Sequence, residues 1–112
     1  MQALADHGIV HRDLKPAQIL VFGGGGGWRT MHAKVADFGR ARGTDVTATA
    51  TAAGGGFVGS YPWGAPESLE SDVYTTMSDV YSFGCILSEV GARWAIRAWL
   101  GSVASLDGKV EK

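Results

Sequence analysis

The chain has 112 residues, a formal net charge of −1 and 46% hydrophobic residues, enough for one small globular domain. The near-zero net charge gives no long-range attraction to nucleic acid or to an anionic membrane, so neither partner is expected. No apolar stretch reaches the roughly 20 residues that span a bilayer and residues 1–8 lack the pattern of a signal peptide, so we expect an intracellular protein with the cytoplasm as its default compartment.

The first half of the chain predicts one short helix and one hairpin. Residues 1–7 have apolar side chains at helical spacing, and Gly8 is placed to end that helix in a left-handed cap. Residues 19–22 predict a short buried strand, and residues 31–36 alternate apolar and polar side chains as its partner. The glycine run between them lacks the Lys-Ser/Thr of a phosphate-binding loop, so we interpret it as a flexible insertion.

The second half predicts a low-complexity segment followed by one clear helix. Residues 43–59 are rich in Thr, Ala and Gly, and this composition favours disorder. Residues 79–90 have apolar side chains at helical spacing (Val80, Phe83, Ile86, Leu87 and Val90), with Thr76 or Ser78 as N-cap and Gly91 as the end. Residues 94–100 are expected to form a short, exposed apolar helix, and residues 101–112 a polar tail.

Residues 11–16 read His-Arg-Asp-Leu-Lys-Pro and combine a base, a cation and a rigid proline in one short loop. Asp13 could accept a proton from an attacking hydroxyl, and Lys15 could neutralise a transferring phosphate. Pro16 limits how far the two groups can move apart. The alternative is an exposed turn whose charged side chains form a solvated salt bridge.

Four motifs in a fixed order carry a family resemblance. After loop 11–16 come Asp37-Phe38-Gly39, then Ala65-Pro66-Glu67, then a run from Asp79 to Gly84. This order closely resembles the protein kinase family over residues 1 to about 91. Leu14-Lys15-Pro16 resembles the Ser/Thr class, and the Tyr-Pro-Trp at 61–63 resembles its tyrosine-kinase-like branch.

The resemblance implies an α+β, protein-kinase-like fold, here a truncated and mostly helical C-terminal lobe with a small β-hairpin. Residues 1–91 would form the partial catalytic domain and residues 92–112 a diverged tail. The implied cofactors are ATP and Mg²⁺, and the implied substrate is a protein with Ser or Thr hydroxyls. Asp13 would be the catalytic base, Lys15 would meet the transferred phosphate, Asp37 would bind Mg²⁺, and Ser60 would touch Asp13 and Lys15 in the substrate site.

Gln18 departs from the family pattern, which places Asn at this position as a ligand of a second Mg²⁺. Gln keeps the amide but moves its oxygen outward by one methylene, about 1.5 Å. Mg²⁺ requires near-ideal ligand positions, so we expect impaired metal binding at Gln18. A backbone adjustment that restores the ligand is the alternative.

The remaining motif residues have supporting roles by resemblance. Residues 43–59 would form the activation segment of the family. Arg12 would pair with a phosphate on Thr44, Thr47, Thr49 or Thr51 of this segment; pairing with a surface carboxylate is the alternative. His11 and Phe38 would pack, the latter as a switch, and Gly39 would act as a hinge.

Glu67 lacks the distant arginine with which the family pairs it and is expected to turn to solvent or loosen its surroundings. Asp79 would support the backbone of loop 11–16; its other interpretation is favourable charge at a helix N-terminus.

Three hypotheses follow. The first is a Ser/Thr protein kinase, whose glycine loop, strand lysine and helix glutamate would lie before Met1, so the isolated chain is expected to be inactive. The second is a pseudokinase-like binding module that engages a kinase partner through residues 94–100 or the activation segment. The third is a truncated gene product without function. The substrate and the upstream regulator stay open.

Overall fold

The computed structural model describes residues 2–23, 25–26, 28–43 and 56–107, and the four threonines proposed as phosphate acceptors lie outside them. Helices and strands alternate irregularly along the chain, so the α+β class is confirmed. The helices and strands are α1 (Gln2–Asp6), β1 (Ile9–Val10), β2 (Ile19–Phe22), β3 (His32–Val35), β4 (Arg42–Gly43), α2 (Pro66–Ser71) and α3 (Thr76–Asp107). Three 3₁₀ turns are η1 (Pro16–Gln18), η2 (Trp28–Thr30) and η3 (Tyr61–Trp63).

Helix α1 ends as its sequence predicts. The chain leaves the helix through Gly8, whose φ of 61° lies in the left-handed region that favours glycine. The Gly8 N–H donates to the carbonyl of Ala5 at 2.9 Å and satisfies one of the free carbonyls at the helix end. This turn directs the chain into β1 and so toward loop 11–16.

Two antiparallel strand pairs follow. β1 pairs with β4, with Val10 opposite Arg42, and so joins the entrance of loop 11–16 to the segment after Asp37-Phe38-Gly39. β2 pairs with β3, with Ile19 opposite Val35, which confirms the predicted hairpin with a shorter second strand.

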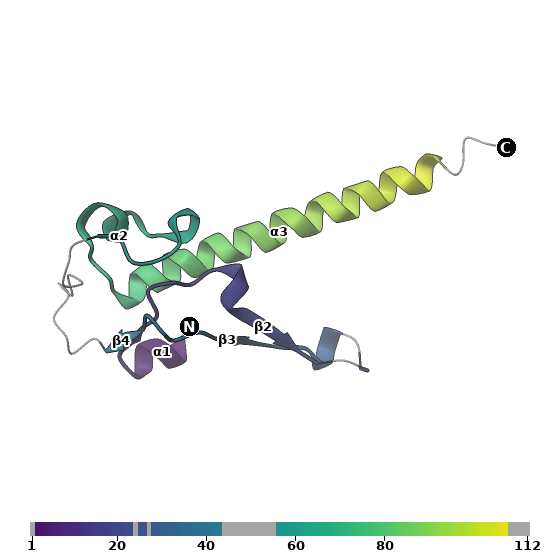
Figure 1. Ribbon diagram of the computed structural model, residues 1–112. Helices are drawn as coiled ribbons and strands as arrows, with labels where there is room; N and C mark the ends of the chain where they lie inside the picture. The colour runs from purple at the N-terminus through teal and green to yellow at the C-terminus, as the bar shows by residue number, and fades with distance from the viewer. Residues whose placement is uncertain (1, 24, 27, 44–55, 108–112) are drawn as a thin grey trace.

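The prediction that β2 is buried is wrong. Leu20, Val21 and Phe22 are 46%, 65% and 49% exposed. Successive side chains of a strand point to opposite faces, so both faces of the hairpin are open in the described part of the chain. Figure 1 shows the hairpin extending away from the helices, where no second layer covers it.

Helix α3 starts earlier and ends much later than predicted. Thr75 caps it, because Ser78 N–H donates to the Thr75 hydroxyl at 3.3 Å and Thr75 N–H donates to the Ser78 hydroxyl at 3.2 Å. The helix then continues through Gly91 to Asp107. One glycine costs a helix only about 1 kcal/mol, and the residues after it are good helix formers. Residues 94–100 therefore continue α3, as do residues 101–107 of the predicted polar tail.

The far half of α3 projects beyond the rest of the molecule (Figure 1). Trp94 and Ile96 are 74% and 58% exposed, which agrees with the expected exposed apolar patch. Val80, Leu87 and Val90, which belong to the apolar set at helical spacing, are also about half exposed. Ile86, at 4% exposure, is the member of that set that is fully buried.

The core lies where the first turns of α3 meet loop 11–16 and the segment around α2. Its apolar members are few, and buried polar residues outnumber them; the buried residues are Val10, Leu14, Ala65, Ile86, His11, Asp13, Gln18, Ser68, Ser78, Asp79 and Ser82. Every buried side-chain nitrogen or oxygen of the described residues has a hydrogen-bond partner. Hydrogen bonds therefore hold this core as much as apolar contacts do.

Candidate active site

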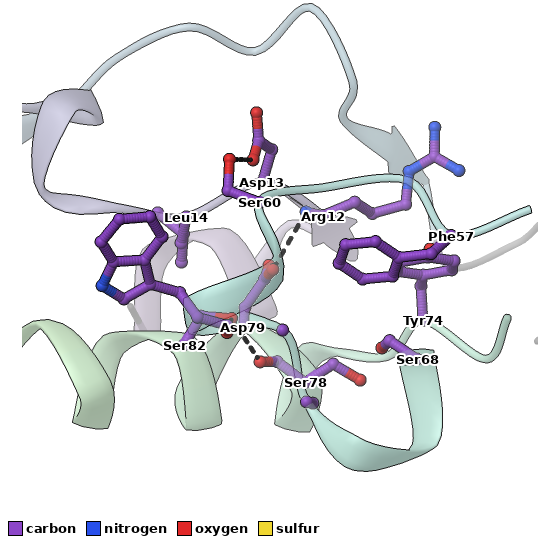
Figure 2. A pocket seen from close by; sticks show the side chains of 13 residues that line it. Arg12, Asp13, Leu14, Phe57, Ser60, Ser68, Tyr74, Ser78, Asp79 and Ser82 are labelled. Atoms are coloured by element: carbon purple, nitrogen blue, oxygen red, sulfur yellow. Dashed lines mark hydrogen bonds between the residues drawn. The ribbon is translucent and has the colours of Figure 1, made fainter. Parts of the chain in front are cut away.

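Asp79, in the first turn of α3, anchors loop 11–16. Its side chain is 2% exposed and accepts the backbone N–H of His11 at 2.6 Å and of Arg12 at 3.0 Å. Figure 2 shows the carboxylate pointing at the Arg12 backbone. Arg12 has a φ of 69°, an unfavourable conformation for a side-chain-bearing residue, and the two hydrogen bonds hold it there. One carboxylate thus fixes a backbone segment 68 residues away in the sequence.

Burial raises the pKa of Asp79 above its ordinary value of 3.8, because a charged carboxylate is disfavoured away from water. The hydrogen bonds from the His11 and Arg12 backbone act in the opposite direction and favour the charged form. The raised pKa shows that the loss of water outweighs these donors. Asp79 therefore stabilises the loop at an electrostatic cost to itself.

The His11 side chain is completely buried and packs under the site. Its Nδ1 accepts the backbone N–H of Asp13 at 3.4 Å, so the ring proton sits on Nε2, which donates to the Ala36 carbonyl at 3.0 Å. The ring also meets Phe38 edge-on, with centroids 5.1 Å apart. His11 thereby links loop 11–16 to the Asp37-Phe38-Gly39 turn, and both of its ring nitrogens are already engaged.

Asp13, Lys15 and Ser60 form one hydrogen-bonded cluster. The Ser60 hydroxyl donates to Asp13 Oδ1 at 2.7 Å (Figure 2), and Lys15 Nζ donates to the Ser60 oxygen at 3.0 Å. Lys15 Nζ also lies 3.6 Å from Asp13 Oδ2. Asp13 is only 9% exposed, so its carboxylate is not the solvated surface salt bridge of the alternative interpretation. A hydroxyl oxygen here sits between a proton acceptor and a cation.

Sequence reasoning missed Arg40, whose Nε lies 3.8 Å from Asp13 Oδ2. Arg40 follows Gly39 directly, so its closeness to the site could have been noticed from its position after the Asp-Phe-Gly motif. Its side chain is 53% exposed, and such exposed pairs contribute little to stability. Arg40 adds a second cation beside the Asp13 carboxylate.

Asp37 lies next to Gln18, at the far side of the loop. Gln18 Nε2 donates to Asp37 Oδ2 at 3.1 Å, and Gly39 N–H donates to Asp37 Oδ1 at 3.3 Å. Among the described residues, no group of three or more His, Cys, Asp or Glu side chains could hold a metal ion. Asp37 therefore offers one carboxylate to a divalent cation, which suits Mg²⁺ only if other oxygens, such as those of a nucleotide, complete its shell.

Arg12 projects toward a basic group of side chains. Its Nε donates to the Arg40 carbonyl at 2.6 Å and its guanidinium lies 5.5 Å from the centre of the Tyr74 ring. Partial burial lowers the pKa of Arg12, and the neighbouring charge of Arg42 lowers it further. No ion pair among the described residues includes Arg12, so the pairing with a surface carboxylate is not observed there.

Glu67 lies apart from this cluster, at the start of α2, and is exposed as one of the two expectations had it. Its Oε1 accepts the Ser78 hydroxyl at 2.8 Å. The chain thus gives this carboxylate a neutral partner on α3, which sequence reasoning missed. The same Ser78 exchanges hydrogen bonds with Thr75, the residue that caps α3, so Glu67 extends that capping network.

A small cavity of about 10 Å³ lies between the loop and α3 (Figure 2). It is lined by Asp13, Leu14, Ser60, Asp79 and Ser82, among others. This volume holds about one water molecule, so the cavity is too small to serve as a substrate pocket.

The comparisons with known proteins decide the family. The model of the protein kinase domain matches residues 1–96, most of the chain. The chain belongs to the protein kinase domain family. The match extends a few residues past Gly91, where the resemblance from sequence was expected to end. Among the described residues, no helix is both long and apolar enough to cross a membrane.

Several curated kinases are similar to the chain. It is 41% identical over 92 residues to the tyrosine-protein kinase receptor Tie-1 of Danio rerio and 39% identical over 90 residues to the serine/threonine/tyrosine-protein kinase HT1 of Arabidopsis thaliana, in both cases over 80% of the chain. It is 40% identical over 89 residues, 75% of the chain, to the serine/threonine-protein kinase PknB of Mycobacterium tuberculosis strain H37Rv. The chain spans 44%, 20% and 12% of these three proteins respectively.

Proposed function

We propose that this chain supplies the acceptor side of an ATP-dependent protein kinase active site that acts on Ser and Thr hydroxyls. The observation that carries the proposal is the Ser60 hydroxyl, which donates to Asp13 at 2.7 Å and accepts from Lys15 at 3.0 Å. An acceptor hydroxyl needs the same two neighbours, a base for its proton and a cation for the phosphoryl group that it receives.

In the proposed reaction, the acceptor oxygen forms a bond to the γ-phosphorus of ATP while the bond from that phosphorus to the β-phosphate oxygen breaks. Asp13 takes the proton of the acceptor hydroxyl, and ADP leaves with the electron pair of the broken bond. Lys15 lies 3.6 Å from Asp13 and balances negative charge on the transferred group. Mg²⁺, when bound, would neutralise phosphate charge, and Asp37 is the carboxylate that would hold it.

The preference for Ser and Thr rests on Leu14-Lys15-Pro16 and on relatives such as PknB, which is named a serine/threonine-protein kinase. Tie-1 and HT1 carry names that include tyrosine, so family membership alone does not choose the hydroxyl. The position of Ser60 supports the choice, because its small hydroxyl fits beside Asp13 and Lys15 without an aromatic ring.

The first experiment is a kinase assay with a mixed protein substrate and labelled ATP. The 112 residues contain no glycine loop before loop 11–16 to cover the phosphates, so the chain alone is expected to transfer no phosphate. Fusion to the glycine-loop lobe of a related kinase should restore labelling of Ser and Thr. Asp13→Asn should reduce that labelling at least about a hundredfold, because it removes the proton acceptor.

Asp6→Asn is the matched control, because Asp6 is an exposed carboxylate in α1, outside the cluster. It should leave the labelling unchanged. Asp13-dependent labelling by the chain alone would contradict the expected inactivity. Labelling by the fusion that survives Asp13→Asn would contradict the proposed chemistry, and labelling of tyrosine alone would contradict the Ser/Thr assignment.

A further inference from the structure

Gln18 departs from the pattern that the chain resembles, and the structure gives its side chain a definite partner. Gln18 is 8% exposed and lies at the end of η1. Its Nε2 lies 3.1 Å from Asp37 Oδ2. A buried amide that lies within hydrogen-bond distance of a carboxylate indicates a role for Gln18 other than metal binding.

The direction of the amide follows from chemistry. An ionised carboxylate only accepts hydrogen bonds, so the atom of Gln18 that faces Asp37 must be the NH₂ group and not the oxygen. Two ligands of one Mg²⁺ would instead point both oxygens at the same ion, each about 2.1 Å from it. The observed contact places an N–H where that shared ion would have to lie.

The same residue also holds the backbone next to Asp37. The Gln18 carbonyl accepts the N–H of Ala36 at 2.8 Å, just beyond the last pair of the β2–β3 ladder, Ile19 and Val35. The backbone and the side chain of Gln18 thus hold Ala36 and Asp37, the two residues that directly follow β3. The side chain reaches past the end of the ladder to Asp37, and its amide lies about 1.5 Å further out than that of Asn would.

Asp37 is a residue that needs such a restraint. Its φ of 60° lies in the left-handed region, which is unfavourable for residues other than glycine. Its second oxygen accepts the Gly39 N–H at 3.3 Å, and the following Phe38 ring meets His11 at 5.1 Å. Without the hydrogen bond from Gln18, Asp37 would be free to move, and the positions of Phe38 and Gly39 would be less well fixed.

We propose that Gln18 is a positioning residue: its amide donates to Asp37 and holds the turn 37–39 in place without a metal, and it supplies no ligand to a divalent cation. A cation at this site then depends on Asp37 as its only ligand from this pair. The restraint exists in the chain without nucleotide. It can therefore be tested apart from phosphate transfer.

The test compares the full 112-residue chain with Gln18→Met, which keeps the length and removes the donor, in metal-free buffer. Asp37 then loses its hydrogen bond from Gln18 and holds the Gly39 N–H less firmly. Amide hydrogen exchange of Gly39, measured by NMR, should therefore accelerate about tenfold. The contact between the Phe38 and His11 rings should weaken in the same spectra. Exchange at His11 and Arg12, which Asp79 holds, should not change and shows that the loop stays folded.

Two further variants keep the test decisive. Gln18→Asn retains a buried amide but falls short of Asp37, so it should accelerate Gly39 exchange as Gln18→Met does. Ala17→Gln places an amide at the neighbouring exposed position and should have no effect. If His11 and Arg12 also exchange faster in Gln18→Met, the result from Gln18→Asn decides. Unchanged Gly39 exchange in a folded variant would overturn the positioning role.

Mn²⁺ serves as the probe for the second half of the proposal, through its paramagnetic broadening of the Gly39 amide. Asp37→Asn should abolish the broadening, and Gln18→Met should shift its midpoint by less than about threefold, since no ligand is lost. A loss of more than about tenfold in Gln18→Met would make Gln18 a ligand and overturn this half. A failure of the Asp13 assay would leave all these readouts intact.

Discussion

The two halves of α3 are one continuous helix with opposite surroundings. In the first half, Ser78, Asp79, Ser82 and Ile86 are buried, and each polar member has a hydrogen-bond partner in another segment or in the cap. From Val90 to Ala98 every residue is exposed. Helix propensity does not explain this difference in burial, because both halves are helical. The difference follows from which other segments pack against each half. The contact between the first half of α3 and loop 11–16 therefore depends on specific polar anchors.

Asp79 is the main polar anchor of the buried half, and its removal should have the largest effect. Asp79→Ala leaves the backbone N–H groups of His11 and Arg12 without their acceptor. Each unsatisfied buried donor costs about 1 to 3 kcal/mol, so we expect a loss of about 3 kcal/mol in the free energy of unfolding. Urea unfolding followed by circular dichroism measures it. Glu70→Ala, at an exposed carboxylate of α2, is the control and should cost less than about 0.5 kcal/mol.

Adjacent residues of α3 give the next test. Ile86 is 4% exposed and Leu87 is 55% exposed, although both belong to the same set of apolar residues at helical spacing. Ile86→Ala should cost about 2 to 4 kcal/mol because it leaves a cavity, and Leu87→Ala less than about 1 kcal/mol. Thermal or urea unfolding of the two variants compares them directly. Equal losses would show that the exposed side of α3 is covered in solution.

A smaller effect concerns pH. Because folding raises the pKa of Asp79, the folded chain binds this proton more readily than the unfolded chain does. The contribution of Asp79 to the free energy of unfolding is fully present below the ordinary value of 3.8 and decreases as pH rises through the raised pKa. The side chain introduced by Asp79→Asn does not titrate. The free energy of unfolding of the wild type, relative to that of the variant, should therefore fall as pH rises above 3.8. A difference that grows with pH would contradict the raised pKa.

The cluster of Asp13, Lys15 and Ser60 could be predicted from the order of motifs, because the resemblance specifies which residues meet across 47 positions of the chain. The partner of Gln18 could not. Its amide reaches Asp37 only through the register of the hairpin and the left-handed turn at Asp37, and neither leaves a mark in the residue types. Arg40 differs from Gln18, because its place directly after the Asp-Phe-Gly motif could have indicated that it lies near Asp13.

Helix boundaries and exposure show a different limit. A hydrophobic pattern predicts which residues could be buried, and burial occurs only where another element packs. Leu20 in β2 and Leu87 in α3 fit apolar patterns and lie about half exposed, because nothing in the described residues covers their outer sides. Local signals at the start of α3 identified the right region, but Thr75 and not Thr76 or Ser78 takes the capping position, as the reciprocal hydrogen bonds with Ser78 show.

Gly91 lies in the exposed half of α3, and its substitution should have the smallest effect. It was predicted to end the helix, yet α3 passes through it, and a Cβ added there would meet nothing within 4 Å. Gly91→Ala should therefore raise helix content by circular dichroism and stabilise the projecting half by about 0.5 to 1 kcal/mol. Gly59→Ala is the contrasting change, because Gly59 has a φ of 143° and its added Cβ would lie 2.9 Å from the Arg12 carbonyl oxygen. It should destabilise the chain, since strain there acts directly on loop 11–16. A loss of helix content in Gly91→Ala would show that the helix is interrupted at this position in solution.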